Sequence, residues 1–183
     1  MAFKRIVPLV LAAVLAFIGA SCDSSVTPSK LLDSTDGRFV VTFPPGFGEP
    51  QLSAHSVDSP VGKLTFSMYI AENSSGACFA SYNDYPPEVI EQGDPKVMLD
   101  GARDGALRNI NGKLIKEDEI TLEGHPGRAI SFSGSKEGKS FFGRADIFLV
   151  NPRLYQVMSL AYSQSDLETP AIRDFFKSFR LKK

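Results

Sequence analysis

The chain has no tryptophan and only two histidines, His55 and His125. Two histidines exclude a metal site built from several imidazoles. No Gly-x-Ser-x-Gly segment is present to carry a serine nucleophile, and no glycine-rich dinucleotide fingerprint follows a predicted strand. The sequence therefore carries no complete catalytic set, and it indicates location and fold better than activity.

Cysteine is almost as scarce, with only Cys22 and Cys78 in the chain. If Cys22 is modified, Cys78 has no partner for an intrachain disulfide. Cys78 lies in the apolar run Ala77–Ala80, where cysteine usually acts as a small buried hydrophobe. We therefore expect Cys78 to be a core residue and not a reactive thiol.

Basic residues are not in excess, because 20 lysines and arginines stand against 21 acids. Lys4 and Arg5 lie in the segment that we expect to be removed, which leaves 18 basic and 21 acidic residues, or −3. Nucleic-acid-binding proteins normally show a basic excess or stripe. The composition thus argues against a nucleic-acid partner, and it provides no polybasic surface for anionic lipid.

The amino terminus has the three parts of a secretory signal, and we assign residues 1–21 to a signal peptide. Lys4 and Arg5 precede an apolar run of 13 residues, Ile6–Ile18, which is too short for a lasting membrane span. The following Gly-Ala-Ser-Cys resembles the bacterial lipobox, in which the cysteine is acylated, although Gly19 stands where leucine is usual. We expect lipidation at Cys22; cleavage after Ser21 by an ordinary signal peptidase is the alternative.

Residues 22–36 follow as the lipidated cysteine and a flexible tether, because Asp23–Ser34 is rich in serine and contains a proline. An aspartate directly after the lipidated cysteine, here Asp23, resembles an inner-membrane retention signal of enteric bacteria. We therefore expect the protein in the bacterial cell envelope, anchored to a membrane through the lipid on Cys22.

Residues 37–183 form one folded domain in this interpretation. Alternating or β-rich apolar segments bounded by turn residues predict strands. These strands are expected at residues 37–43, 51–57, 63–71, 77–82, 113–122, 129–133, 141–150 and 154–162, with a linker at 84–93.

Two helices are predicted. Asp94 and Pro95 begin the first one, and Asn111-Gly112 end it. Its sheet-facing residues are Leu99, Ala102, Ala106 and Ile110, and Gly101 and Gly105 are expected to let it approach the sheet closely. The second begins at Thr169-Pro170 and carries a core-facing stripe of Ile172, Phe175, Phe176 and Phe179. Together the elements predict an α+β fold, an antiparallel sheet of about six to eight strands covered by helices.

Three polar segments resemble functional motifs without meeting their requirements. Gly134–Ser140 has a phosphate-loop composition but is followed by a strand, so we interpret it as a hairpin turn. The acidic run Glu117–Glu119 is interpreted as a solvated face or bulge, not as a metal site. Asp100 and Asp104 lie one helical turn apart and are interpreted as a solvated helix face.

The segment around His125 is predicted to reverse the chain at Pro126-Gly127, with Gly127 at positive φ. Arg128 would then tie carbonyls or a carboxylate across this turn. A hydrolase that uses His125 as its acid–base residue is an alternative, but the sequence offers it no obvious partner.

The segments 99–132, 144–157 and 174–181 resemble a group of uncharacterised bacterial envelope lipoproteins. The shared features are a helix rich in small residues, a Gly-His-Pro-Gly-Arg turn, an Arg-Leu-Tyr-Gln strand and a closing Phe-x-x-Ser-Phe helix. Their layout is similar to the fold of PsbP, the extrinsic photosystem II protein, and of a yeast Ran-binding transport factor. The resemblance covers about Arg38 to Leu181 and implies an α/β/α sandwich without enzyme activity; Ala129 departs from the glutamate that is common in the group.

The function that we expect is a non-catalytic binding or accessory role at the membrane, with an unknown envelope protein as partner and no cofactor or metal. The candidate binding residues are His125, Arg128, Arg144, Arg153 and Tyr155. A small-ligand carrier with an aromatic cleft under the closing helix is a further alternative.

Overall fold

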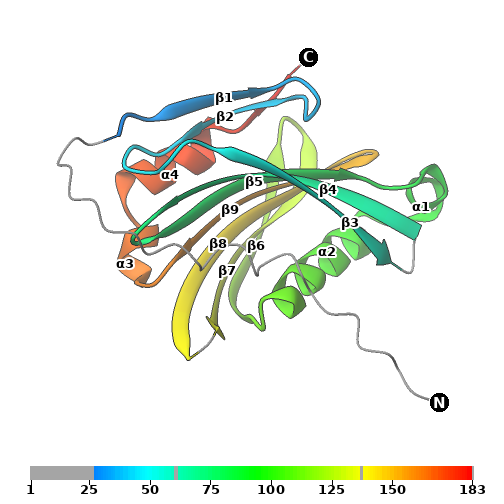
Figure 1. The fold of residues 1–183 in the computed structure, drawn as a ribbon. Coiled ribbons are helices and arrows are strands. Elements are labelled where there is room, and N and C mark those ends of the chain that lie inside the picture. The colour runs from blue at the N-terminus through cyan, green and yellow to red at the C-terminus, as the bar shows by residue number, and fades with distance from the viewer. Residues whose placement is uncertain (1–26, 60–61, 137, 183) are drawn as a thin grey trace.

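The computed structural model describes residues 27–59, 62–136 and 138–182 (Figure 1). The strands are β1 (Lys30–Ser34), β2 (Phe39–Phe43), β3 (Gln51–Ser59), β4 (Gly62–Asn73), β5 (Gly76–Asp84), β6 (Lys113–Leu122), β7 (His125–Lys136), β8 (Lys139–Val150), β9 (Arg153–Ala161) and β10 (Arg180–Leu181). The helices are α1 (Pro87–Gln92), α2 (Pro95–Asn109), α3 (Gln164–Leu167) and α4 (Pro170–Ser178). No helix among these residues is both long enough and apolar enough to cross a membrane.

Seven strands form one antiparallel sheet in the order β3-β4-β5-β9-β8-β7-β6. A second sheet, β1-β2-β10, lies with α4 over one face of the large sheet, which we call the α4 face (Figure 1). Helix α2 lies on the opposite face, which we call the α2 face. The observed architecture confirms the predicted α+β class with an antiparallel sheet covered by helices.

The larger core lies between α4 and the two sheets, and aromatic rings fill it. Phe175 stacks near Phe43 with ring centroids 5.1 Å apart, and Phe179 lies at the same distance from Phe39. The predicted stripe is confirmed, since Ile172, Phe175, Phe176 and Phe179 are between 1% and 7% exposed. Burying each of these side chains contributes about 1.5–3 kcal/mol to folding.

A second core lies on the α2 face. Leu99 of α2 is 1% exposed and packs in one cluster with residues of β7, β8 and β9. Asp94 caps this helix as predicted, because its carboxylate accepts hydrogen bonds from the backbone N–H groups of Lys96 and Val97. Met98, Ala102, Leu107 and the cap residue Ile110 also pack against this cluster. Polar contacts between α2 and the sheet add the network described below.

The tether is shorter than predicted. Residues Lys30–Ser34 form β1 and pair with β2 along the whole strand, and Leu32 packs against the α4-side core. Serine-rich composition predicted a flexible segment here, but backbone pairing with β2 and one apolar anchor outweigh it. The predicted signal peptide, Cys22 and Asp23 lie outside the described residues.

The turn before Arg128 was also placed wrongly. The chain reverses at Glu123 and Gly124, whose φ angles are 51° and 87°, and His125 already begins β7. Gly127 lies inside the sheet, where an added Cβ would stand 2.5 Å from the carbonyl oxygen of Ile147. A glycine is therefore needed at Gly127 because of close backbone approach, and not because of positive φ.

Two smaller expectations about helices are corrected. The predicted linker 84–93 contains α1, although none of its residues is buried. Gly101 and Gly105 do not mediate close approach, because a Cβ at Gly101 would meet nothing within 4 Å and one at Gly105 only the Arg108 side chain at 3.9 Å. By contrast, residues Gly134–Ser140 do form a hairpin, in which Lys136 pairs with Lys139.

Candidate functional site

The five candidate binding residues do not form one site. Arg128 lies on the α2 face, where it reaches α2. Arg144 and Arg153 lie over aromatic rings on the opposite, α4 face, and Tyr155 belongs to the core of that face. His125 stands at the start of β7. The structure therefore divides the candidates among separate contacts.

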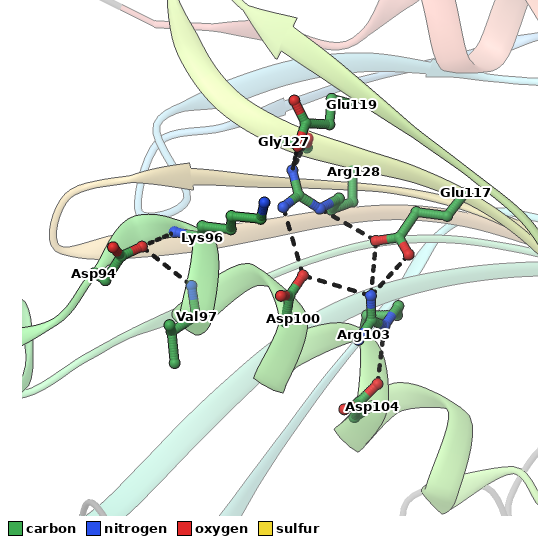
Figure 2. A network of polar contacts seen from close by, with 10 residues as sticks. All are labelled: Asp94, Lys96, Val97, Asp100, Arg103, Asp104, Glu117, Glu119, Gly127 and Arg128. Atoms are coloured by element: carbon green, nitrogen blue, oxygen red, sulfur yellow. Dashed lines mark hydrogen bonds and ion pairs between the residues drawn. The ribbon is translucent and has the colours of Figure 1, made fainter.

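Arg128 is the centre of a charged network between α2 and β6 (Figure 2). Its side chain is 7% exposed, and its Nε lies 3.1 Å from a carboxylate oxygen of Glu117. Its two Nη atoms lie 3.4 Å from Asp100 on α2 and 3.4 Å from Glu119 on β6. The buried guanidinium thus meets three carboxylates, which offset the cost of removing it from water.

Arg103 extends the network along α2. It donates hydrogen bonds to Asp104 at 2.8 Å and to both carboxylate oxygens of Glu117, the shorter at 2.7 Å (Figure 2). The hydrogen bond with Asp104 raises the pKa of Arg103 and lowers the pKa of Asp104. Two arginines and four acids, Asp100, Asp104, Glu117 and Glu119, give the network a charge of −2.

This network joins three segments of the chain: the acidic part of β6, the charged residues of α2, and Arg128 of β7. The acidic run on β6 and the acids of α2 were both interpreted as solvated faces. Glu117 is instead only 23% exposed and is shared by both arginines, whereas Asp104 is 50% exposed. The bulge lies outside the acidic run, because the register shifts between Leu114 and Lys116, whereas residues 117–119 pair with β7 in continuous register. The register between β6 and β7 places Glu119 opposite Arg128, and a hairpin of these two strands accounts for that contact. The position of α2 beside the two strands follows from no local sequence pattern.

Arg153 and Tyr155 fasten the turn between β1 and β2 to the large sheet. Arg153 binds Asp84 through two hydrogen bonds and donates a third, at 2.6 Å, to the carbonyl oxygen of Asp36. The Tyr155 hydroxyl donates to the carbonyl oxygen of Gly37 at 2.8 Å. Both side chains are therefore engaged in holding the small sheet in place.

Arg144 lies between β8 and α4. Its guanidinium stands 4.2 Å from the centre of the Phe176 ring and 3.2 Å from a carboxylate oxygen of Asp146. Burial raises the pKa of Asp146, and the charge of Arg144 opposes this effect. The arrangement stabilises α4 against the sheet by a cation–π contact.

His125 differs in its environment from the other four candidate binding residues. Its side chain is half-buried, and no hydrogen bond or ion pair joins its ring to the rest of the chain that the structure describes. Within the same residues, no group of three or more histidines, cysteines, aspartates or glutamates could hold a metal ion. Among the described residues, the structure therefore shows no group hydrogen-bonded to the His125 ring.

The space under α4 is filled by close-packed rings, so the aromatic cleft suggested for a ligand carrier is not formed there. A half-open hollow of about 240 Å³ lies instead at the amino-terminal end of α4. Phe47, Ala161 and Ile172 are among the apolar residues that line it, and Asp166 also lines it. Ser159 lines the hollow as well, and its hydroxyl lies 3.6 Å from the Cys78 Sγ atom.

Cys78 is fully buried, as predicted, and is a free thiol. Burial raises its pKa to about 12, although the hydrogen bond with Ser159 acts in the other direction. At neutral pH the thiolate, which is the reactive form, is therefore scarce. Cys78 behaves as a core residue.

Comparison with known proteins gives a likeness of fold. No protein-family model matches the chain, and no curated protein matches it. The solved structure of cyanobacterial PsbP (CyanoP) from Synechocystis sp. PCC 6803 aligns with a TM-score of 0.54 and 10% sequence identity, covering 90% of this chain and 98% of that chain.

A protein of unknown function from Pseudomonas aeruginosa, PA94, aligns over 76% of this chain and 86% of its own. Its TM-score of 0.37, at 15% identity, is too low to support an argument. The likeness to CyanoP confirms the predicted PsbP-like fold, and at 10% identity it shows the fold alone.

Proposed function

We propose that this chain is a lipid-anchored accessory protein of the bacterial envelope, which docks a partner protein and catalyses no reaction. The support from the structure is that Arg128, Arg144, Arg153 and Tyr155 are all engaged in contacts that hold the fold together. The support from the sequence is the signal peptide followed by Cys22, with Asp23 favouring retention at the inner membrane. The PsbP-like fold agrees with an accessory role.

The docking surface that we propose is the exposed edge strand β6. It is the last strand of the large sheet, so one side of its backbone has no neighbouring strand in that sheet. Two adjacent hydrophobic side chains project there at the bulge, Leu114 at 36% exposure and Ile115 at 60%. This pair is the observation that carries the proposal, because two consecutive exposed hydrophobic residues on an unpaired edge strand form a site that another chain can cover by pairing with the strand.

The charges around this pair indicate the chemistry of the partner. Residues 113–123 contain two lysines and four acids, which is a charge of −2. Glu119 is 76% exposed and Asp118 is 52% exposed. A protein that presents an apolar patch surrounded by basic residues would complement this edge.

Site-specific cross-linking tests the docking surface. A photo-reactive amino acid at position 115 should trap one protein in envelope preparations, and the same group at Leu31, which is 70% exposed on β1, should not. The purified protein should then bind the unmodified chain and bind Ile115→Lys at least tenfold more weakly. Equal binding by Ile115→Lys, or equal trapping at position 31, would reject β6 as the docking surface.

The anchor is tested separately. Mass spectrometry of the mature amino terminus should find a diacylglyceryl cysteine at position 22, and Cys22→Ser should move the protein to the soluble fraction. A Cys22→Ser protein that still sediments with membranes would reject the lipid anchor while leaving the β6 surface open to its own test.

A further inference from the structure

Asn83 of β5 is a buried polar residue without a partner. It is 2% exposed, and neither its side-chain oxygen nor its side-chain nitrogen has a hydrogen bond within the part of the chain that the structure describes. Leaving a buried amide unpaired destabilises a protein by about 1–3 kcal/mol. This loss of stability at Asn83 requires an explanation. A ligand that binds to the Asn83 amide is one explanation.

The register of the sheet shows what surrounds Asn83 on the α2 face. Ser81 lies two residues away on the same side of β5, and Gln156 of β9 stands directly opposite Ser81. Ser81 is 8% exposed and Gln156 is half-buried, and neither side chain has a hydrogen bond within the described ranges. Three neighbouring polar side chains are therefore unpaired on one face.

Methionines surround this polar group. Met68 of β4 stands opposite Ser81, and Met158 of β9 lies two residues from Gln156 on the same face. Met98 of α2 and Met158 both pack against the core cluster of the α2 face. All three are half-buried. Methionine side chains adapt to different shapes and are common at surfaces that bind varied apolar groups.

The neighbouring segment between β5 and α2 is only lightly attached. Helix α1 buries none of its residues, and Tyr85 and Met98 at its two sides are only partly buried (Figure 1). Elements with few buried contacts open at low free-energy cost. Asn83 lies two residues before Tyr85, so movement of this segment is the route that a ligand would need to reach the closed Asn83 side chain.

We propose that Asn83 is the polar anchor of a ligand site on the α2 face of β4, β5 and β9, which binds a small apolar molecule carrying an uncharged amide. The Asn83 side chain offers an acceptor and a donor side by side, and an amide supplies the complementary pair. Met68 and Met158 contact the apolar part. The site is separate from β6 and does not depend on the proposed docking function.

The ligand group is uncharged because the neighbours of Asn83 on the α2 face of the described sheet, Ser81, Leu154 and Gln156, carry no charge. Arg38, which helps to lower the pKa of Asp84, lies in the turn between β1 and β2. Arg128 is three strands from β5, about 14 Å at the usual strand spacing, and it is already paired with three carboxylates. Arg153 binds Asp84 and stacks over Tyr82 on the opposite face. A carboxylate at Asn83 would therefore lose its hydration without gaining a counter-charge.

Nuclear magnetic resonance of methionine methyl groups tests the site, with octanamide as the probe and octanoate as the charged control. Octanamide should shift the Met68 and Met158 signals in a saturable manner, and octanoate should bind at least tenfold more weakly. Asn83→Leu should weaken octanamide binding at least tenfold. Thr65→Val, on the opposite face of β4, should leave the affinity unchanged.

Absence of saturable shifts up to the solubility limit of octanamide would overturn the proposal. Equal affinity in Asn83→Leu, or equal affinity for octanoate, would also overturn it. Should Asn83→Leu fail to fold, Asn83→Ala provides the same comparison, with a thermal melt recorded for each variant to confirm folding. None of these measurements involves the partner that binds β6, so the two proposals can fail independently.

Discussion

Arg153 and Asp84 face each other at the end of the large sheet and form a bidentate ion pair. The Arg153 Nε lies 2.5 Å from one Asp84 oxygen, and an Nη lies 2.6 Å from the other. The Arg153 side chain is 9% exposed, whereas that of Asp84 is 49% exposed. The pair therefore combines a buried cation with a partly solvated anion.

The first prediction concerns the pH dependence of this pair. Hydrogen bonds from Arg153 lower the pKa of Asp84 below 3.8. Because the folded pKa lies below the unfolded one, the stabilisation is present above the unfolded pKa and is lost as the pH falls through the folded value. Asp84→Asn should cost about 1 kcal/mol at pH 7, a figure discounted for the exposure of the carboxylate.

Urea unfolding at pH 7 and at pH 2.5 measures this effect. The difference between the original protein and Asp84→Asn should shrink at the lower pH, because Asp84 of the unfolded chain is mostly protonated there. A constant difference at both pH values would show that the ion pair does not contribute.

The second prediction concerns Gly127. Gly127→Ala should destabilise the protein by about 1–3 kcal/mol, because the new Cβ would clash with the Ile147 carbonyl oxygen and the Phe148 ring at 2.5 and 2.6 Å. Thermal unfolding of the variant measures the loss. A variant as stable as the original would mean that β7 and β8 separate more easily than their register indicates.

The third prediction has the opposite sign. Gly101 is exposed in the middle of α2, and its Cβ would meet no atom within 4 Å. Gly101→Ala should therefore raise the free energy of unfolding by about 0.5–1 kcal/mol, because alanine is the better helix former. Denaturant unfolding measures the change, and a loss of stability would indicate a contact that this position makes through its backbone.

The fourth prediction concerns the core under α4. Phe175→Ala should cost about 3–5 kcal/mol, because a 1% exposed ring that contacts Phe43 and Phe176 is replaced by a cavity. Val97→Ala, at a position of α2 that is 67% exposed, is the control and should change stability by less than about 0.5 kcal/mol. A loss below about 1 kcal/mol in Phe175→Ala would mean that α4 is peripheral.

Local patterns predicted the elements that dominate the fold. The stripe from Ile172 to Phe179 and the cap at Asp94 depend on residues close together in the chain, and both are confirmed. The error at Gly127 has a different origin. Proline followed by glycine is typical of a turn, but the two residues Glu123 and Gly124 had already reversed the chain. Glycine at 127 reflects contact with β8, which no local pattern reports.

The polar contacts were the least predictable part. The network of Arg128 with Asp100 and Glu117 joins a helix to two strands, and its members are 11 to 28 residues apart. Each acid by itself has the composition of a solvated surface. Only the packing of α2 on β7 and β8 turns them into partners of a buried arginine.

Because β1 belongs to the folded domain, the segment that can link the domain to a membrane is short. Thr27 is already held at the domain, because its carbonyl oxygen accepts a hydrogen bond from the Gly46 N–H at 2.8 Å. With Cys22 as the proposed anchor, five peptide links lead to Thr27, and a fully extended chain covers about 18 Å over that distance. The loop around Gly46 would then be confined to a thin shell above the lipid headgroups, and a partner would meet the domain within about one domain's length of the membrane surface.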